Sequence, residues 1–125
     1  MTGRVVHFEI PFDDGERARA FYSEAFGWNI MPVPEMDYTM VMSGPTGEQG
    51  PDEAGFINGG MMQREEPFTA PNIVVDVDNL EAALKAINEA GGTTVTERQT
   101  VGDMGFAAYF RDSEGNLLGL WESAS

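Results

Sequence analysis

The sequence predicts an α+β fold built from two tandem β-α-β-β-β modules within a single domain, residues 1–125. The first observation is an internal duplication, because residues 7–27 and 72–92 align without a gap at a constant offset of 65. The second is the order of patterns in each copy, where alternating apolar residues precede a helical apolar spacing and a closing glycine. One supersecondary unit is therefore used twice, as module 1 (residues 1–65) and module 2 (residues 66–125).

Each copy opens with a strand. Val6, Phe8 and Ile10 alternate with His7 and Glu9, which is the period-two pattern of a strand with one apolar face. The second copy repeats the pattern over residues 72–77.

A helix follows each strand. Asp13 and Asp78 stand three residues before a glutamate, so each is placed to cap a helix start. Gly27 and the pair at 91–92 are expected to end the helices. The apolar spacing predicts core-facing residues in both helices, namely Ala18, Phe21, Tyr22, Ala25 and Phe26 in the first and Leu80, Ala83, Leu84 and Ile87 in the second.

Three further strands complete each module. We expect them at 28–33, 38–43 and 56–62 in the first module, and at 93–98, 105–111 and 116–122 in the second. The stretch 44–55 is rich in glycine, proline and acids and is typical of a loop, and residues 63–71 are expected to link the modules.

The composition excludes several functions. With 21 acidic and 7 basic residues the formal charge is −14, so neither nucleic acid nor an anionic membrane is an expected partner. The acidic surface either serves solubility or steers cationic ligands towards a cleft. The chain has no cysteine, apolar run of membrane-spanning length or secretory pattern, so we expect a cytoplasmic protein.

Two segments carry a family resemblance. AFYSEAFGW at 20–28 and DSEGNLLGLWE at 112–122, together with the tandem modules, resemble the vicinal oxygen chelate superfamily of glyoxalase I, extradiol dioxygenases and bleomycin-resistance proteins. The resemblance covers essentially the whole chain. It implies curved mixed sheets that enclose a cleft, and commonly a homodimer.

The resemblance also implies positions for a divalent metal, at His or Glu residues that correspond between the modules. His7 occupies the first position, but its twin is Asn72, and the other two positions fall on Gly59 and Gly119. One of four expected ligands remains, so we expect no metal cofactor. A divalent ion is the alternative, held by His7, Glu9 or Glu122, although the odd spacing from Gly119 turns Glu122 to the opposite face.

His7 and Glu9 are the candidate catalytic residues. They share one face of a strand, and the only histidine of the chain is a natural general base because its ordinary pKa lies near neutrality. The alternative is that His7 lines the cavity or is satisfied by a neighbouring hydrogen bond.

The glycines also predict a binding pocket. Gly59 and Gly119 would free volume at the floor of the cleft, and Met61 and Trp121, two residues further on, would share their face. These four residues and Asn72 form the predicted ligand-binding set. Tyr38, Phe106 and Tyr109 could stack on an aromatic or cationic guest, but the sequence does not fix the direction in which they face.

Two function classes follow. The first is a metal-independent protein of the bleomycin-resistance type that binds, and could sequester, a cationic or aromatic small molecule at the interface of a homodimer. The alternative is a metal-dependent lyase, isomerase or dioxygenase of the superfamily, and metal-free enolisation by His7 or Glu9 is a third possibility. Whether the chain is an enzyme stays open at this point.

Overall fold

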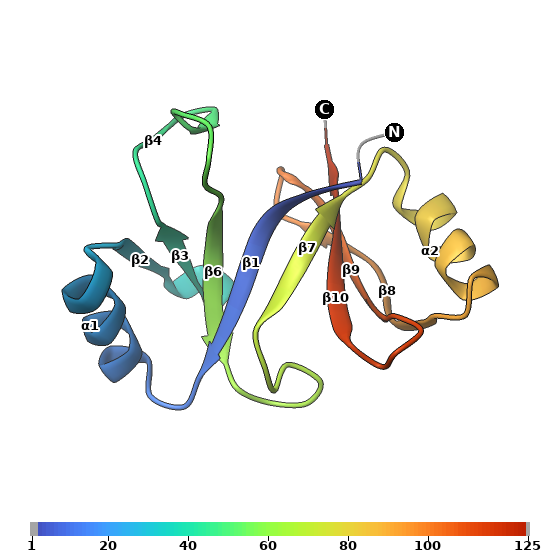
Figure 1. The fold of residues 1–125 in the computed structure, drawn as a ribbon, viewed down its shortest axis with the longest axis horizontal. Coiled ribbons are helices and arrows are strands. Elements are labelled where there is room, and N and C mark those ends of the chain that lie inside the picture. The colour runs from blue at the N-terminus through green and yellow to red at the C-terminus, as the bar shows by residue number, and fades with distance from the viewer. Residues whose placement is uncertain (1–2, 125) are drawn as a thin grey trace. The chain divides into compact units, whose positions relative to one another are not determined.

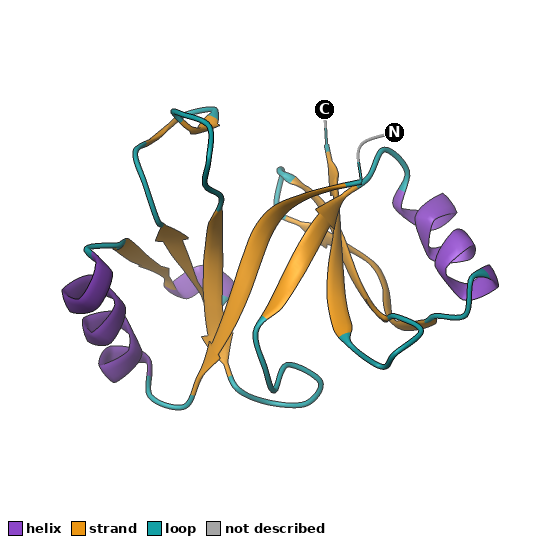
Figure 2. Cartoon of the chain, in the orientation of Figure 1, coloured by secondary structure: helices purple, strands orange, loops and turns teal. Residues whose placement is uncertain are grey.

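The order β-α-β-β-β occurs twice along the chain, and the first copy has a short 3-10 helix and a small hairpin in addition. The computed structural model describes residues 3–124. Along the chain the elements are β1 (Arg4–Phe12), α1 (Gly15–Phe26), β2 (Asn29–Val33), a short 3-10 helix η1 (Pro34–Met36), β3 (Tyr38–Met42), β4 (Thr46–Gly47), β5 (Gly50–Pro51), β6 (Asn58–Gln63), β7 (Asn72–Asp76), α2 (Leu80–Glu89), β8 (Thr93–Val101), β9 (Gly105–Arg111) and β10 (Leu117–Ser123) (Figures 1 and 2). The predicted α+β class and the repeated β-α-β-β-β order are confirmed. Neither helix is long and apolar enough to cross a membrane within the described residues.

The chain divides into two compact units, one formed by residues 7–71 and the other by residues 72–125 with the first six residues. In the 7–71 unit the strands run in the order β2-β3-β6-β1, with β1 and β6 parallel and the other pairs antiparallel. In the 72–125 unit the order is β8-β9-β10-β7, and there β10 and β7 are the parallel pair. The same mixed topology in both units is the structural counterpart of the sequence duplication.

The helix starts correct one prediction. Asp14 and Asn79 cap the helices through side-chain oxygens that accept from the backbone N–H of Arg17 and Ala82. Both caps therefore lie one residue later than expected. Asp13 instead forms an ion pair of 2.9 Å with Arg64.

The helix ends are as predicted. Gly27 adopts a left-handed conformation with φ of 72° and donates to the Ser23 carbonyl, and Gly91 has a positive φ after α2. The stretch 44–55, predicted as a loop, contains the small β4–β5 hairpin.

The two helices differ in how they are packed. In the 72–125 unit α2 buries Leu80 and Leu84 against a core that also contains Val77, Ala108, Phe110 and Leu120. In the 7–71 unit no residue of α1 is buried, so its predicted core-facing side chains are partly or largely exposed. The fully buried side chains of that unit, Val41 and Met61, come from the strands.

Candidate functional site

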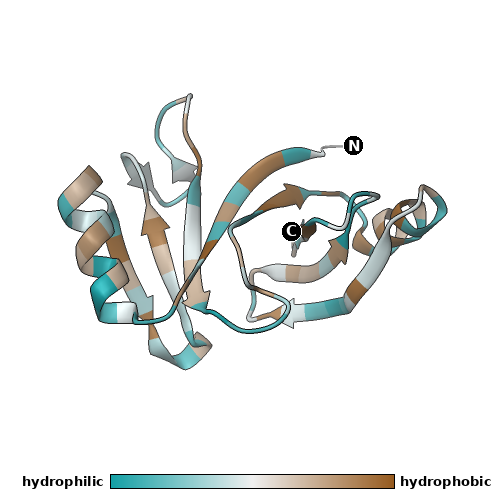
Figure 3. Ribbon diagram, turned by 60° about the horizontal axis from the view of Figure 1, so that its bottom comes forward, coloured by the Kyte–Doolittle hydropathy of each residue, from teal (hydrophilic) through white to brown (hydrophobic). Residues whose placement is uncertain are grey.

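The alternation of β1 separates polar from apolar side chains. His7 and Glu9 point to one face, while Phe8 points to the other, where its ring lies 5.7 Å from that of Trp28. Trp28 in turn stacks on Tyr22 of α1, with 5.1 Å between the ring centroids. The helix therefore lies on the Phe8 side of the strands, and Figure 3 shows the alternation of hydropathy along β1.

A chain of hydrogen bonds joins three side chains on the other face, which we call the His7 face. The Tyr38 hydroxyl donates to Oε2 of Glu9 over 2.9 Å and lies 2.8 Å from Nε2 of His7. A tyrosine hydroxyl carries one hydrogen, so the bond to His7 takes its hydrogen from Nε2. The His7–Tyr38–Glu9 chain thus leaves Nδ1 of a neutral His7 as the ring nitrogen with a free lone pair.

Gly60 makes this arrangement possible. It lies on β6 between the strands that carry the three side chains, directly opposite Glu9 on one side and Met40 on the other. A Cβ at Gly60 would collide with the hydroxyl and the ring of Tyr38. The tyrosine therefore reaches from β3 across β6 to β1 over a residue without a side chain.

Burial sets the protonation of the site. Glu9 is 5% exposed, which is unusual for a carboxylate unless it is hydrogen-bonded. Burial lowers the pKa of His7 below its usual value, and the negative charge of Glu9 opposes this effect without overcoming it. His7 is therefore held neutral near pH 7, in agreement with its role as donor through Nε2.

Four methionines share the His7 face with the polar chain. Met31 and Met40 stand in register with Gly60 and Glu9, and directly opposed residues of neighbouring strands share a face. Met42 and Met62 lie two residues from Met40 and Gly60 and so point the same way. Thioethers are flexible and polarisable, so this lining can adapt to apolar guests.

The structure places Gly59 and Met61 on the opposite face. Gly59 is in register with Phe8, whose side chain a Cβ at Gly59 would strike, and Met61 is fully buried. The expectation that they face the same way as His7 is therefore wrong. The reason is that Gly60, and not Gly59, corresponds to Gly119. Glu9 is in register with Gly60, and its twin Val74 is in register with Gly119.

In the 72–125 unit, Gly119 and Trp121 share a face of β10, as the spacing predicts. The Trp121 ring lies over Gly105, where a Cβ would come within 2.7 Å of it. Tyr109 lies over Gly119, with 3.0 Å from its ring to a Cβ there. Phe106, by contrast, packs against the α2 core beneath the Arg98 guanidinium.

Two further predicted residues have distinct environments. Glu122 turns to the opposite face from Gly119, as expected, where Oε1 accepts from the backbone N–H of Leu80 at the start of α2. Asn72 is 7% exposed, and neither polar atom of its side chain has a hydrogen-bond partner in residues 3–124. The ligand-binding roles of Gly59, Met61, Asn72, Gly119 and Trp121 stay predictions.

Comparison with known proteins identifies the family of the chain. A family model described as bleomycin resistance protein-like N-terminal matches residues 4–44. A glyoxylase-like domain-containing protein of Didymella fabae is 31% identical over 93% of this chain and 91% of its own length. The chain belongs to the vicinal oxygen chelate superfamily.

A second relative and a solved structure are also similar to this chain. A probable lactoylglutathione lyase of Vibrio parahaemolyticus serotype O3:K6 (strain RIMD 2210633) is 27% identical over 95% of this chain and 90% of its own. A methylmalonyl-CoA epimerase of Streptomyces coelicolor, solved in complex with 2-nitronate-propionyl-CoA, superposes with a TM-score of 0.66 at 17% identity, and all of both chains is covered. The second similarity shows the fold of the superfamily alone.

The residues present do not fit the divalent metal centre that the superfamily implies. In residues 3–124 no three His, Asp, Glu or Cys side chains lie together in an arrangement that could hold a metal ion. Of the two ligating side chains on the His7 face, Glu9 accepts from Tyr38 and His7 is bonded to the same hydroxyl through Nε2. A metal ion there would have to compete with this hydrogen-bond chain.

Proposed function

We propose that this protein binds a small organic molecule on the His7 face, as a member of the superfamily of the bleomycin-resistance kind. The observation that carries the proposal is the His7–Tyr38–Glu9 chain, a partly buried polar group set among methionines on the face turned away from Phe8 and Trp28. Binding sites commonly combine an adaptable apolar lining with a few oriented polar groups.

The charge of the site favours a particular ligand chemistry. Burial outweighs the charge of Glu9 in setting the pKa of His7, so the polar chain presents the Glu9 carboxylate beside a neutral imidazole at low exposure. A ligand with a cationic group or a hydrogen-bond donor can satisfy it, and an aromatic or aliphatic body can lie on the methionines. The formal charge of −14 would raise the local concentration of such cations. A cationic aromatic compound is therefore the proposed ligand class.

Methyl NMR of methionine provides a direct test. Met31, Met40, Met42 and Met62 are half of the eight methionines, so we expect their methyl signals to shift with a cationic aromatic compound while those elsewhere stay unchanged. Neutral aromatic compounds and α-keto acids are titrated in the same way for comparison.

The matched control variants separate the site from the general charge. Glu9→Gln should weaken the binding of cations about tenfold or more, because it removes a desolvated charge. Glu97→Gln, which removes an exposed carboxylate, should leave binding within about twofold. Equal weakening by both variants, or preference for anions, would contradict the proposal.

A second function is favoured by the geometry of His7. Its Nδ1 lone pair is that of a neutral imidazole, oriented by Tyr38 and supported by Glu9, which is the arrangement of a general base. The relative described as a probable lactoylglutathione lyase and the epimerase neighbour both have names that indicate proton-transfer chemistry. Metal-free proton abstraction next to a carbonyl is therefore the alternative function.

Turnover assays distinguish the two. We expect no product from 2-oxoaldehyde hemithioacetals, catechols or CoA esters, with or without added Ni²⁺, Zn²⁺, Mn²⁺ or Fe²⁺. Turnover abolished by His7→Gln and preserved after chelation would establish the alternative. Metal retained near one equivalent by untagged protein through dialysis, and lost in His7→Ala, would overturn the expectation of a metal-independent protein.

A further inference from the structure

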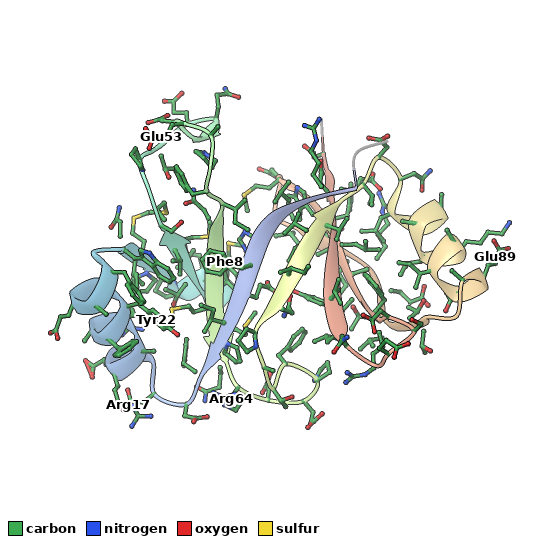
Figure 4. All side chains as sticks on the ribbon, viewed as in Figure 1. Phe8, Arg17, Tyr22, Glu53, Arg64 and Glu89 are labelled. Carbon is green, nitrogen blue, oxygen red and sulfur yellow. The ribbon has the colours of Figure 1, made fainter. Side chains whose placement is uncertain are left out.

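The connection between β3 and β6 is much longer than its counterpart in the other unit. It consists of fifteen residues, 43–57, whereas β9 and β10 are joined by the five residues 112–116. Both connections close an antiparallel pair of strands. The additional length forms the β4–β5 hairpin at one end of the 7–71 unit (Figure 1). Figure 4 shows Glu53 of this connection at the opposite end of the unit from Arg64, which follows β6.

A small set of hydrogen bonds fixes the base of this hairpin. Nδ2 of Asn58 donates to Oγ1 of Thr46 over 3.0 Å, and Oδ1 of Asn58 accepts from the backbone N–H of Ser43 over 3.0 Å. The Ser43 hydroxyl donates to the carbonyl of Ile57 over 2.7 Å and so joins the two stems. We call Asn58, Thr46 and Ser43 the Asn58 clamp. A hairpin of two residue pairs is marginally stable alone, so its position depends on this clamp.

The clamp stands beside His7. Asn58 is in register with His7 on the neighbouring parallel strand, so both side chains lie on the His7 face. Met42 continues the register of β3 with β6 and stands opposite Asn58 from the other side. The clamp therefore fixes Thr46, the first residue of β4, one side chain away from His7 on the same face.

The twin position has an apolar residue in place of the clamp. Because Gly60 corresponds to Gly119, Asn58 corresponds to Leu117. Leucine offers no side-chain hydrogen bond, and the short connection beside it is closed by bonds to Asp112. The amide and the long connection therefore occur together, in the unit that contains the His7–Tyr38–Glu9 chain.

We propose that the β4–β5 hairpin is a wall of the ligand site on the His7 face, and that Asn58 is the residue that positions it. The hairpin excludes water from His7 and bounds the space beside the imidazole. An amide suits this position, because one neutral side chain must donate to Thr46 and accept from Ser43 at the same time. The ligand part of this inference rests on the proposed function, whereas the shielding of His7 does not.

The charges around His7 make the effect of the wall recognisable. Burial is the largest cause of the lowered pKa of His7, and the charge of Glu9 opposes it. The hairpin connection carries three more carboxylates and no basic residue, namely Glu48, Asp52 and Glu53. Withdrawal of these negative charges would lower the pKa of His7, whereas entry of water would raise it. A rise in this pKa when the hairpin is released therefore reports the loss of shielding.

Thr46→Val releases the hairpin without changing any residue of the polar chain. The substitution removes the hydroxyl that Asn58 holds and keeps the shape of the side chain. Thr46→Ser retains the hydroxyl, and Thr100→Val makes the same change at an exposed threonine of the other unit. Hydrogen exchange should be about fivefold faster in Thr46→Val at the N–H of Asp52, which donates to Pro45 within the hairpin, because one hydrogen bond of about 1 kcal/mol is lost. Both other variants should exchange like wild type.

NMR titration of His7 tests the wall without a ligand. Thr46→Val should raise the pKa of His7 towards its ordinary value, and Thr46→Ser and Thr100→Val should leave it unchanged. A second variant replaces residues 43–57 by the sequence of 112–116, which joins the same kind of strand pair in the other unit. It should raise this pKa at least as far.

Two results would overturn the proposal. Unchanged exchange of the hairpin in Thr46→Val would show that Asn58 does not position it. Faster exchange with an unchanged pKa of His7, in this variant and in the shortened one, would show that the hairpin does not shield the site.

Titration with ethidium, a planar aromatic cation, tests the ligand part. Its Kd should rise about fivefold in Thr46→Val and stay unchanged in Thr46→Ser and Thr100→Val, since the same hydrogen bond orders the wall. An unchanged Kd in a Thr46→Val protein with faster hairpin exchange would overturn the role of the hairpin in binding. Wild-type protein that does not bind ethidium would instead contradict the proposed ligand class, and the pKa of His7 would then decide the role of the wall alone.

Discussion

Replacement of Gly60 by alanine should break the polar chain of the His7 face without touching any of its members. A Cβ at this position collides with the Tyr38 ring, so the ring must leave β6 and its hydroxyl must leave His7 and Glu9. The bond to the charged Glu9 is worth about 1.5–3 kcal/mol and the bond to His7 about 1 kcal/mol. Replacing a strand glycine returns about 0.5–1 kcal/mol.

The net destabilisation is therefore about 1.5–3.5 kcal/mol, which corresponds to a fall in Tm of about 6–13 °C for a domain of this size. Chemical denaturation gives the free energy of unfolding. The matched control is Gly119→Ala, where the nearest atoms belong to Tyr109 and Val74 at 3.0 and 3.1 Å and need to give way only slightly. We expect that variant to stay within about 0.5 kcal/mol of wild type.

A double-mutant cycle isolates the cause. In a Tyr38→Ala background there is no ring to displace, so Gly60→Ala should cost nothing further. The same loss in both backgrounds would refute the reasoning, because the cost would then arise from the backbone of β6 and not from Tyr38. A wild-type free energy of unfolding in Gly60→Ala alone would refute it as well.

Three shorter predictions test the rest of the site. NMR titration should place the pKa of His7 below its ordinary value, and Glu9→Gln should lower that pKa further by removing the opposing charge. Because the folded-state pKa is depressed, the stability due to neutral His7 is present above about pH 6.5 and is lost as the pH falls towards the folded pKa. Thermal unfolding across that pH range would show this loss. Glu122→Ala should cost about 1 kcal/mol of unfolding free energy by leaving the N–H of Leu80 without its acceptor, while cation binding on the His7 face stays unchanged in the methionine NMR assay. Asn72→Leu should raise the free energy of unfolding by about 1 kcal/mol in chemical denaturation, since an apolar group replaces a buried amide without partners. A destabilised variant would show that the amide of Asn72 is hydrogen-bonded in solution.

The fold could be predicted because its signals are local and occur twice. Alternation in β1 and β7, polar caps before the helices and glycines after them recur at one offset, so each copy supports the assignment of the other. The cap positions shifted by one residue because acidic or amide side chains stand side by side, Asp13 next to Asp14 and Asp78 next to Asn79. Local sequence does not decide which of two adjacent capping residues takes the role.

The site was harder to predict because it depends on the register between strands. His7 and Glu9 could be found, since their spacing alone places them on one face of β1. Gly59 and Gly60 are consecutive, and the sequence comparison paired Gly59 with Gly119, although Gly60 is its counterpart. A shift of one residue moves every side chain of the strand to the opposite face, so the predicted facing of β6 was reversed. The part played by Tyr38 depends on that register and on a neighbouring strand, so no local pattern indicates it.

The two copies, compared in register, show where the duplication has diverged. In both units a tyrosine ring covers a glycine of an inner strand. Tyr109 stands directly opposite Gly119. Gly60 instead stands opposite Met40, and Tyr38, two residues before Met40 on β3, reaches it diagonally.

This diagonal reach brings the Tyr38 hydroxyl to His7 and Glu9, whose twins Asn72 and Val74 offer an amide and an apolar side chain. Within residues 3–124, the twin positions Asn72 and Val74 therefore form no counterpart of the bonds that His7 and Glu9 make with Tyr38. The fold needs the positions that the copies share, while the proposed chemistry uses positions where they differ. This contrast supports the proposal that the His7 face is the functional site, independently of any relative.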